Sequence, residues 1–272
     1  MIYFVATPIG NLKDITLRAL DVLREVDIIA CEDTRTSKTL LEKYEIRNKY
    51  LISYHKFNEQ ESSDNIIKLN SEGKNIAIIS DAGMPGISDP GNILAKKLVE
   101  CGIEFTVIPG ASALTTALVL SGFDSHNFYF AGFLPEKNSD KDKLLAEIST
   151  LSSTLIFYVS SHNIKKDINY LYNQLGDRKA CLVKELTKIF ENKYYFNLSV
   201  LPEIDERGEF VLIVEGNTKS LNVEEMSISE HVLFYINLGL SKNDAIKKVA
   251  KERNLAKNEV YKQVLDLNVN RE

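Results

Sequence analysis

Short apolar runs alternate with segments of helical spacing along the first 130 residues, and this alternation limits the chain to few folds. The runs occupy 2–6, 28–31, 76–80, 105–108 and 128–131, and each has the length of a β-strand. They are apolar on both faces, as the strands of a buried parallel sheet are. The helical patterns between them lie within 17–23, 39–44, 66–69, 93–99 and 113–120. We therefore predict an α/β domain over 1–132, in which helices cover a parallel sheet.

The second half predicts a different sheet. A turn-forming segment, Gly132-Phe-Leu-Pro135, is the expected linker. After it we expect a second α/β domain over 137–220, with helices at 141–148 and 163–175 and strands at 154–159, 180–185, 194–198 and 210–215. The last two strands are expected to pair as neighbours, which predicts a mixed sheet. A helical extension over 223–272 follows, with helices at 224–238, 243–252 and 257–266. The expected helix N-caps are Thr16, Ser112 and Ser241.

The composition indicates a globular cytoplasmic protein without a structural metal. The chain has 272 residues, of which 44% are hydrophobic and 26% charged, with a net charge of -5. No apolar run approaches the ~20 residues that span a bilayer, and the first residues lack the pattern of a signal peptide. The cysteines are few and far apart, so neither a disulfide framework nor a CxxC metal site is indicated. They are Cys31, Cys101 and Cys181.

One segment is basic although the net charge of the whole chain is negative. Residues 241–263 carry seven basic and three acidic side chains. A basic helical face of this kind is usually just solvated, but it also fits RNA contact or the ordering of a dimer. The turn at 253–256 is equally open, because it could belong to a helix-turn-helix or to a plain helical hairpin.

Small, polar and turn-forming residues follow the first four predicted strands, and they also follow the short apolar pair Leu51-Ile52. In a parallel sheet these positions share one edge, where ligands bind. The loops match none of the dinucleotide, P-loop or nucleophile-elbow patterns. The residues themselves therefore predict a small-molecule cleft of another type. The loops are Thr7-Pro-Ile-Gly-Asn11, Glu32-Asp-Thr-Arg35, the segment from Ser53 to Glu59, Asp81 to Gly91, and Pro109-Gly-Ala-Ser-Ala113.

These residues resemble the tetrapyrrole methylase superfamily of S-adenosylmethionine-dependent methyltransferases, and within it the bacterial group that methylates a ribose 2′-hydroxyl of small-subunit ribosomal RNA. The match runs in order over about 2–216. An opening Thr-Pro-Ile-Gly-Asn distinguishes this group from relatives that methylate porphyrin and corrin rings. The motifs are Thr7-Pro-Ile-Gly-Asn-Leu-Lys-Asp-Ile-Thr16, Cys31-Glu-Asp-Thr-Arg35, Ser80-Asp-Ala-Gly83, Asp89-Pro-Gly91, Pro109-Gly110, Gly132-Phe-Leu-Pro135, Thr154-Leu-Ile-Phe-Tyr158, Lys184-Glu-Leu-Thr-Lys188 and Gly208-Glu209.

The resemblance implies a two-domain class III methyltransferase, a homodimer, that holds S-adenosylmethionine between its domains and needs no metal. Its implied substrate is a decoding-centre cytidine of 16S ribosomal RNA in the 30S subunit, and a membrane has no part. Three positions depart from the family pattern, namely Met84, Val159 and Asn163. By motif, the implied cofactor-binding residues are Pro8, Ile9, Asp81, Gly83, Met84, Ser112, Ala113, Tyr158, Leu186 and Val211.

Methyl transfer to a ribose hydroxyl needs alignment and help in removing a proton. Candidates on the predicted edge are Asp33 and Arg35 for substrate positioning, and His55 or Glu59 for proton handling. Asp33 and Arg35 could also simply pair with each other. Two other functions stay open, which are methylation of a tetrapyrrole or protein acceptor and a non-catalytic RNA-binding scaffold.

Overall fold

The computed structural model describes residues 1–217, 226–237 and 240–264. The chain divides into two compact units, Met1–Gly216 and Asn217–Glu272. The larger unit contains two five-stranded sheets, and the smaller one is helical.

The first sheet is wholly parallel, as predicted, with the strand order β3-β2-β4-β1-β5. Its central strands are buried on both faces, which explains their unbroken apolar runs. The strand β3 is not among the predicted strands, because its sequence contains no long apolar run. It lies half-exposed at the edge of the sheet. The strands are β1 (Ile2–Val5), β2 (Ile28–Cys31), β3 (Tyr50–Ser53), β4 (Ile76–Ile79) and β5 (Phe105–Ile108).

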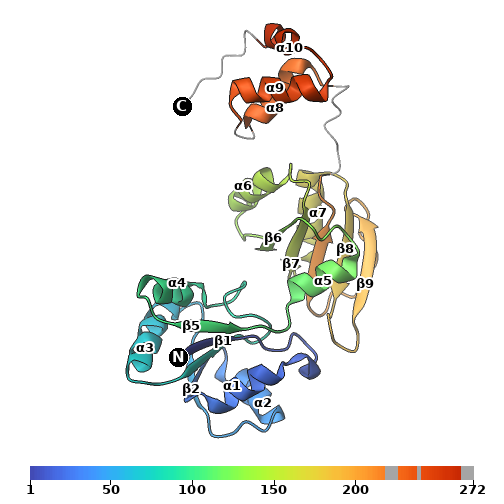
Figure 1. The fold of residues 1–272 in the computed structure, drawn as a ribbon. Coiled ribbons are helices and arrows are strands. Elements are labelled where there is room, and N and C mark those ends of the chain that lie inside the picture. Colours follow the sequence, from blue (N-terminus) through green and yellow to red (C-terminus); the bar gives the residue numbers. More distant parts are fainter. Residues whose placement is uncertain (218–225, 238–239, 265–272) are drawn as a thin grey trace. The chain divides into compact units, whose positions relative to one another are not determined.

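Two helices cover each face of this sheet (Figure 1). Leu23 and Leu41 bring α1 and α2 onto one face, while Ile66 and Leu94 bring α3 and α4 onto the other. The predicted cap at Thr16 is confirmed, since its side chain accepts a hydrogen bond from the N–H of Ala19. The helices are α1 (Leu17–Glu25), α2 (Thr34–Lys43), α3 (Glu59–Ser71) and α4 (Asn92–Glu100).

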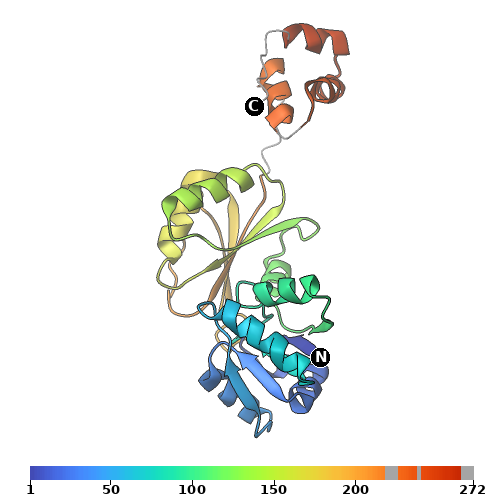
Figure 2. The same cartoon turned by 90° about the vertical axis from the view of Figure 1, so that its left-hand side faces the viewer.

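The second sheet is mixed, as predicted, with the order β6-β7-β10-β8-β9. The β6–β7 pair is parallel and the other three pairs are antiparallel. Helices α6 and α7 pack on one face of this sheet, and α5 packs on the other (Figure 2). The strands are β6 (Phe128–Phe133), β7 (Thr154–Val159), β8 (Lys179–Lys184), β9 (Asn192–Asn197) and β10 (Phe210–Val214), and the helices are α5 (Ala113–Ser121), α6 (Asn138–Ile148) and α7 (Ile164–Leu175).

Two expectations about strand placement are wrong. The run at 128–131 does not extend the first sheet, because β6 pairs with β7 and includes the first half of the expected linker. The strands β9 and β10 are not neighbours, because β8 lies between them and pairs with both. Both errors concern pairing between distant segments, which local apolar patterns do not encode.

The smaller unit is built from α8 (Ile228–Asn237), α9 (Lys242–Glu252) and α10 (Lys257–Gln263). Val232, Val249 and Val260, one from each helix, meet in its core. The predicted cap at Ser241 is confirmed, since it accepts from the N–H of Asp244. The outer parts of the expected helices at 224–238 and 257–266 lie outside the described residues. Within the described ranges, no helix is both long and apolar enough to cross a membrane.

Candidate functional site

Three loops at the carboxyl edge of the first sheet are tied together by their backbones. Thr7, after β1, exchanges hydrogen bonds with Gly83, after β4, with N···O distances of 2.9 and 3.1 Å. The Thr7 hydroxyl also donates to the carbonyl of Ser80 at 3.2 Å. Gly110, after β5, lies so close that a Cβ there would come within 2.8 Å of the Ala6 Cβ. The glycines in these motifs therefore allow a close approach of backbone segments.

A cavity of about 430 Å³ lies between this edge and one face of the second sheet. Its size and largely apolar lining suit a small organic ligand. The first sheet contributes its loops, and the second contributes β7, β8, β10 and the segments that flank them. Of the predicted cofactor-binding residues, Pro8 and Asp81 lie outside the lining, and the following lie in it: Ile9, Gly83, Met84, Ser112, Ala113, Tyr158, Leu186 and Val211.

Aromatic rings form part of the wall from the second sheet. The Tyr158 ring meets Phe130 edge-on at 4.9 Å and Phe133 at 5.5 Å between centroids. Burial, and then the charge of Asp89 on the opposite side, raises the pKa of the Tyr158 phenol. A charge from the first-sheet side of the cavity therefore acts on a side chain of the second sheet.

Carboxylates crowd the first-sheet side of the cavity. Burial, followed by the charges of Glu32 and Asp81, raises the pKa of Asp89 to about 6. Burial also raises the pKa of Glu32 and of Asp81, and in each case a neighbouring aspartate adds to the shift. Such crowding opposes folding at neutral pH, and it is typical of functional sites. Asp89 lines the cavity, although it is not among the residues predicted from the motifs.

Asp33 and Arg35 do pair with each other. Arg35 donates from Nε and Nη2 to the two oxygens of Asp33 at 3.1 and 2.8 Å, and its backbone N–H donates at 2.8 Å. These bonds lower the pKa of Asp33 to about 2, so its carboxylate is a weak base. Asp33 also donates its own N–H to Asp81 at 3.3 Å. The Arg35 side chain is 90% exposed.

His55 lies in the loop before α3 and Glu59 is the first residue of that helix, and the two side chains differ in their hydrogen bonds. The Oε1 atom of Glu59 accepts hydrogen bonds from the N–H groups of Gly91 and Ile93 at 2.8 and 3.1 Å, and from the Tyr54 hydroxyl at 3.1 Å. Glu59 therefore caps α4. The Nδ1 atom of His55 is buried and has no hydrogen-bond partner within the described part of the chain. The four candidate catalytic residues lie outside the cavity lining.

The same loop presents an aromatic ring to solvent. Phe57 is 95% exposed, and its ring meets the His55 ring edge-on with centroids 6.1 Å apart. Two hydrogen bonds stabilise the turn next to it, because Asn58 accepts from the His55 N–H at 2.8 Å and donates to the Ser53 carbonyl at 3.2 Å. No periodic pattern identifies such a residue, since an isolated phenylalanine in a sequence more often lies in a core.

Further cavity residues lie in two segments, at the end of β7 and just before β10, and none of them is among the predicted site residues. Val159 and the serines after it line the cavity, and so does Gly208 with its neighbours. Ser112 holds the N-cap position of α5, where its carbonyl oxygen accepts from the N–H of Thr116. Among the residues placed by the structure, no group of three or more histidine, cysteine, aspartate and glutamate side chains could hold a metal ion.

Comparison with known sequences gives a consistent family. Residues 1–202 match the family described as Tetrapyrrole (Corrin/Porphyrin) Methylases. A protein of Bacillus subtilis named ribosomal RNA small subunit methyltransferase I is 42% identical over 271 residues, which cover 96% of this chain and 92% of that protein. A protein of the same name from Mesomycoplasma conjunctivae is 46% identical over 224 residues, covering 80% of this chain and 92% of that protein.

Solved structures share the fold at low sequence identity. A diphthine synthase aligns with a TM-score of 0.65 and 17% identity, covering 80% of this chain and 90% of its own. A uroporphyrin-III-C-methyltransferase from Thermus thermophilus aligns with a TM-score of 0.58 and 19% identity, covering 79% and 93%. The predicted fold class is therefore confirmed, while these two structures leave the acceptor open.

Proposed function

The chain belongs to the tetrapyrrole (corrin/porphyrin) methylase family, and on this premise we propose that it is a ribosomal RNA methyltransferase. Its methyl donor is S-adenosylmethionine, and its acceptor is the ribose 2′-hydroxyl of a decoding-centre cytidine in the 16S RNA of the 30S subunit. The observation that carries the proposal is the cavity, because residues that the family motifs assign to the donor come together there from both sheets. The enzyme works in the cytoplasm, where its substrate is, as a homodimer.

The cavity fits the donor in size and in the nature of its walls. Its volume of about 430 Å³ lies in the range for cofactor-sized ligands. Leu186, Val211 and Tyr158 supply apolar surface for a heteroaromatic ring, while Gly83 allows backbone to approach closely. S-adenosylmethionine supplies a methyl group activated by a positively charged sulfonium. The carboxylates at the first-sheet edge favour a positive ligand there.

The acceptor lies over the outer rim of the same edge. Arg35 is exposed and cationic, Lys56 is exposed in the loop after β3, and Phe57 in the same loop offers an aromatic face. Unpaired RNA bases stack on such rings, and cations hold the phosphates. Because Cys31 pairs with Ser53 in adjacent parallel strands, the loops that carry these residues leave the sheet together.

The chemistry divides between positioning and proton removal. The low pKa of Asp33 suits it to hold Arg35 against the substrate rather than to accept a proton. Since Oε1 of Glu59 already accepts three hydrogen bonds, we assign proton handling to His55. S-adenosylmethionine would supply the methyl group and leave as a neutral thioether, and the His55 imidazole would take up the proton of the ribose hydroxyl. Alignment of the reactants supplies much of the acceleration.

The decisive experiment measures transfer of labelled methyl groups to 30S particles by the wild type and by Asp33→Ala. We expect donor binding to persist in this variant and turnover to fall at least tenfold, since Arg35 loses its anchor. If both stay near wild type, the assignment of Asp33 is wrong. Transfer to uroporphyrinogen or to a protein, but not to 30S, would replace the RNA acceptor. A wild type that shows no thermal shift with S-adenosylmethionine would point to a scaffold.

A ribose-methylation map of 16S RNA tests the finer claim. Cells that lack the protein should lose one 2′-O-methyl group, on a cytidine of the decoding centre, and regain it when the wild-type chain is restored. Restoration by Asp33→Ala to the full level would contradict the role of that residue.

A further inference from the structure

The loop after β8 has an unusual backbone. Glu185 and Thr187 both lie in the left-handed region, with φ of 51° and 65°. Non-glycine residues seldom adopt this conformation, and where they do, the surrounding structure must hold them. Two such residues flank Leu186, which is 6% exposed and lines the cavity. The conformation of this loop therefore determines where one wall of the donor cavity lies.

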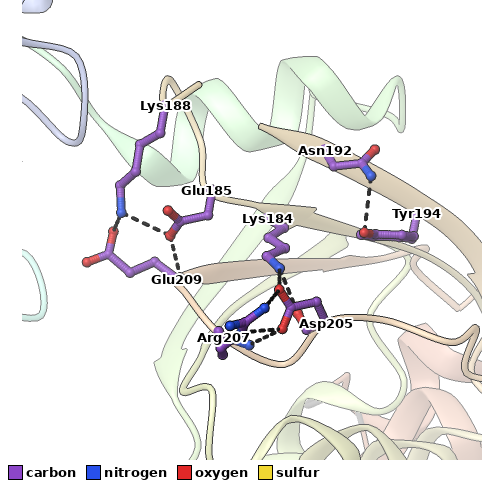
Figure 3. A network of polar contacts seen from close by, with 8 residues as sticks. All are labelled: Lys184, Glu185, Lys188, Asn192, Tyr194, Asp205, Arg207 and Glu209. Carbon is purple, nitrogen blue, oxygen red and sulfur yellow. Dashed lines mark hydrogen bonds and ion pairs between the residues drawn. The ribbon is translucent and has the colours of Figure 1, made fainter. Parts of the chain in front are cut away.

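A cluster of charges holds the loop in place (Figure 3). The Nζ atom of Lys188 lies 2.9 Å from Oε1 of Glu185 and 2.9 Å from Oε2 of Glu209. Oε1 of Glu185 also accepts from the backbone N–H of Glu209 at 2.9 Å. We call Glu185, Lys188 and Glu209 the clamp. Glu209 itself lines the cavity, so the clamp joins two of its walls.

The clamp depends on its single cation. Burial alone would raise the pKa of Glu185, but the bonds from Lys188 and from the Glu209 N–H lower it overall. Without Lys188, two carboxylates would face each other at short range, and like charges at such distances repel. Glu209 would then move, and the left-handed loop would lose its support.

The first loop of the chain rests on the clamp. A Cβ on Gly10 would lie 2.6 Å from Cγ of Lys188, 2.8 Å from Oγ1 of Thr187 and 2.9 Å from the Leu186 carbonyl. The Asn11 N–H donates to Oγ1 of Thr187 at 3.0 Å. Only a residue without a side chain fits at position 10, so the two loops, 176 residues apart, are in direct contact.

We propose that Lys188 is a positioning residue that couples the first loop to the second-sheet wall and so sets the affinity for the methyl donor. The inference rests on the proposed function for the identity of the ligand, but the coupling between the loops does not. The clamp is expected to affect donor binding and not acceptor binding, because the acceptor rim at Arg35 and Phe57 belongs to other loops.

The first experiment measures donor affinity by calorimetry with S-adenosylmethionine and, in parallel, the KM and kcat of methyl transfer. Lys188→Met should raise the Kd and the donor KM about tenfold, and leave kcat and the RNA KM within about twofold. Lys188→Arg should restore most of the affinity, because guanidinium can bridge two carboxylates. The matched control is Lys165→Met, which removes an exposed lysine paired with Glu206 in the same sheet domain.

A second variant separates charge repulsion from simple loss of packing. If repulsion displaces Glu209, then Glu209→Gln in the Lys188→Met background should recover part of the lost affinity. A merely structural role for Lys188 predicts instead a lower melting temperature with an unchanged donor KM in the folded fraction. That result, or equal losses in Lys165→Met, would overturn the proposal.

The coupling is measured without ligand by hydrogen exchange. Amides of residues 9–13 should exchange about tenfold faster in Lys188→Met, and also in Gly10→Ala, whose Cβ would push the loops apart. The two changes combined should be no worse than either alone, because they break the same contact. Gly73→Ala is the control, since that glycine also has a positive φ but no atom within 4 Å of the new Cβ.

These readouts distinguish the two proposals. Faster exchange in a protein that binds no S-adenosylmethionine would contradict the proposed function while supporting the coupling. Donor binding with unchanged exchange in Lys188→Met would leave the proposed function standing and overturn the coupling.

Discussion

The two sheets of the larger unit contribute to one cavity in opposite ways. The first sheet supplies loops with small residues and crowded carboxylates, such as Asp81 and Asp89, at its carboxyl edge. The second supplies a face of apolar side chains, such as Val183 and Leu186, and the clamp beside it contributes the charge of Glu209. A parallel sheet gathers loop chemistry at one edge, whereas an antiparallel sheet offers mainly a packed face. We therefore expect the two sides to respond differently to pH and to truncation.

The largest effect is expected on the apolar side, from Leu186→Ala. Leu186 packs with Ile9 and Val211 in one core cluster, so the truncation should lower the free energy of unfolding by about 2–3 kcal/mol. The loss should be the same at pH 5 and pH 8, because no charge changes. Urea unfolding at both pH values measures it. A loss that appears only at one pH would contradict the comparison.

On the carboxylate side, Asp89→Asn is expected to stabilise the protein at neutral pH. The pKa of Asp89 is raised from 3.8 to about 6, so the folded state holds its proton more tightly than the unfolded state does. This contribution is full below pH 3.8 and is lost as the pH rises through 6. With each pKa unit near 1.4 kcal/mol, the gain of the variant should be about 1–3 kcal/mol at pH 8.

Thermal unfolding from pH 4 to pH 8 checks this sign. The difference between Asp89→Asn and the wild type should be near zero at pH 4 and should grow with pH. Asp21→Asn, at an exposed site on α1, is the matched control and should show no such trend. A variant that is less stable than the wild type at pH 8 would mean that the Asp89 carboxylate is held by favourable contacts.

The same comparison separates what the sequence could and could not predict. The buried strands and the loops at their ends follow from local patterns, and eight of the ten residues predicted to bind the cofactor line one cavity. The crowding around Asp89 depends on how the loops after β2 and β4 meet in space, and the positions of β6 and β9 in the second sheet depend on pairing between distant segments. Glu185 and Thr187 have left-handed backbone conformations although neither is a glycine, so the sequence does not indicate them.

Glu59 illustrates the limit for a single residue. A glutamate in a loop near a predicted site suggests acid–base chemistry, but here its carboxylate caps a helix that begins more than thirty residues later. The hydrogen bonds to Gly91 and Ile93 depend on the packing of α3 against α4, which no local spacing reveals. Roles that depend on such contacts need the structure.

A smaller effect, on binding alone, is expected for Asp81→Ala. Asp81 is partly exposed, lies beside the cavity rather than in its lining, and accepts a hydrogen bond from the Asp33 N–H. Loss of its charge should weaken S-adenosylmethionine binding by about 1–2 kcal/mol, as for a hydrogen bond to a charged group. Calorimetry measures the change. An unchanged Kd would contradict the proposal that the positively charged sulfonium of the donor binds near this edge.

The smallest effect is expected for Phe57→Ala, at the outer rim of the first-sheet edge. Because the ring is 95% exposed, its removal should alter the free energy of unfolding by less than about 0.5 kcal/mol. Loss of one stacked base should raise the KM for 30S particles about fivefold, near 1 kcal/mol, with the donor Kd unchanged. Phe57→Tyr should keep the wild-type KM. Phe190→Ala, which removes an aromatic side chain 77% exposed after β8, is the control. An equal loss in Phe190→Ala, or a change in oligomeric state with Phe57→Ala, would show that the rim does not read RNA, and would leave the two sides of the cavity differing only in how they hold the donor.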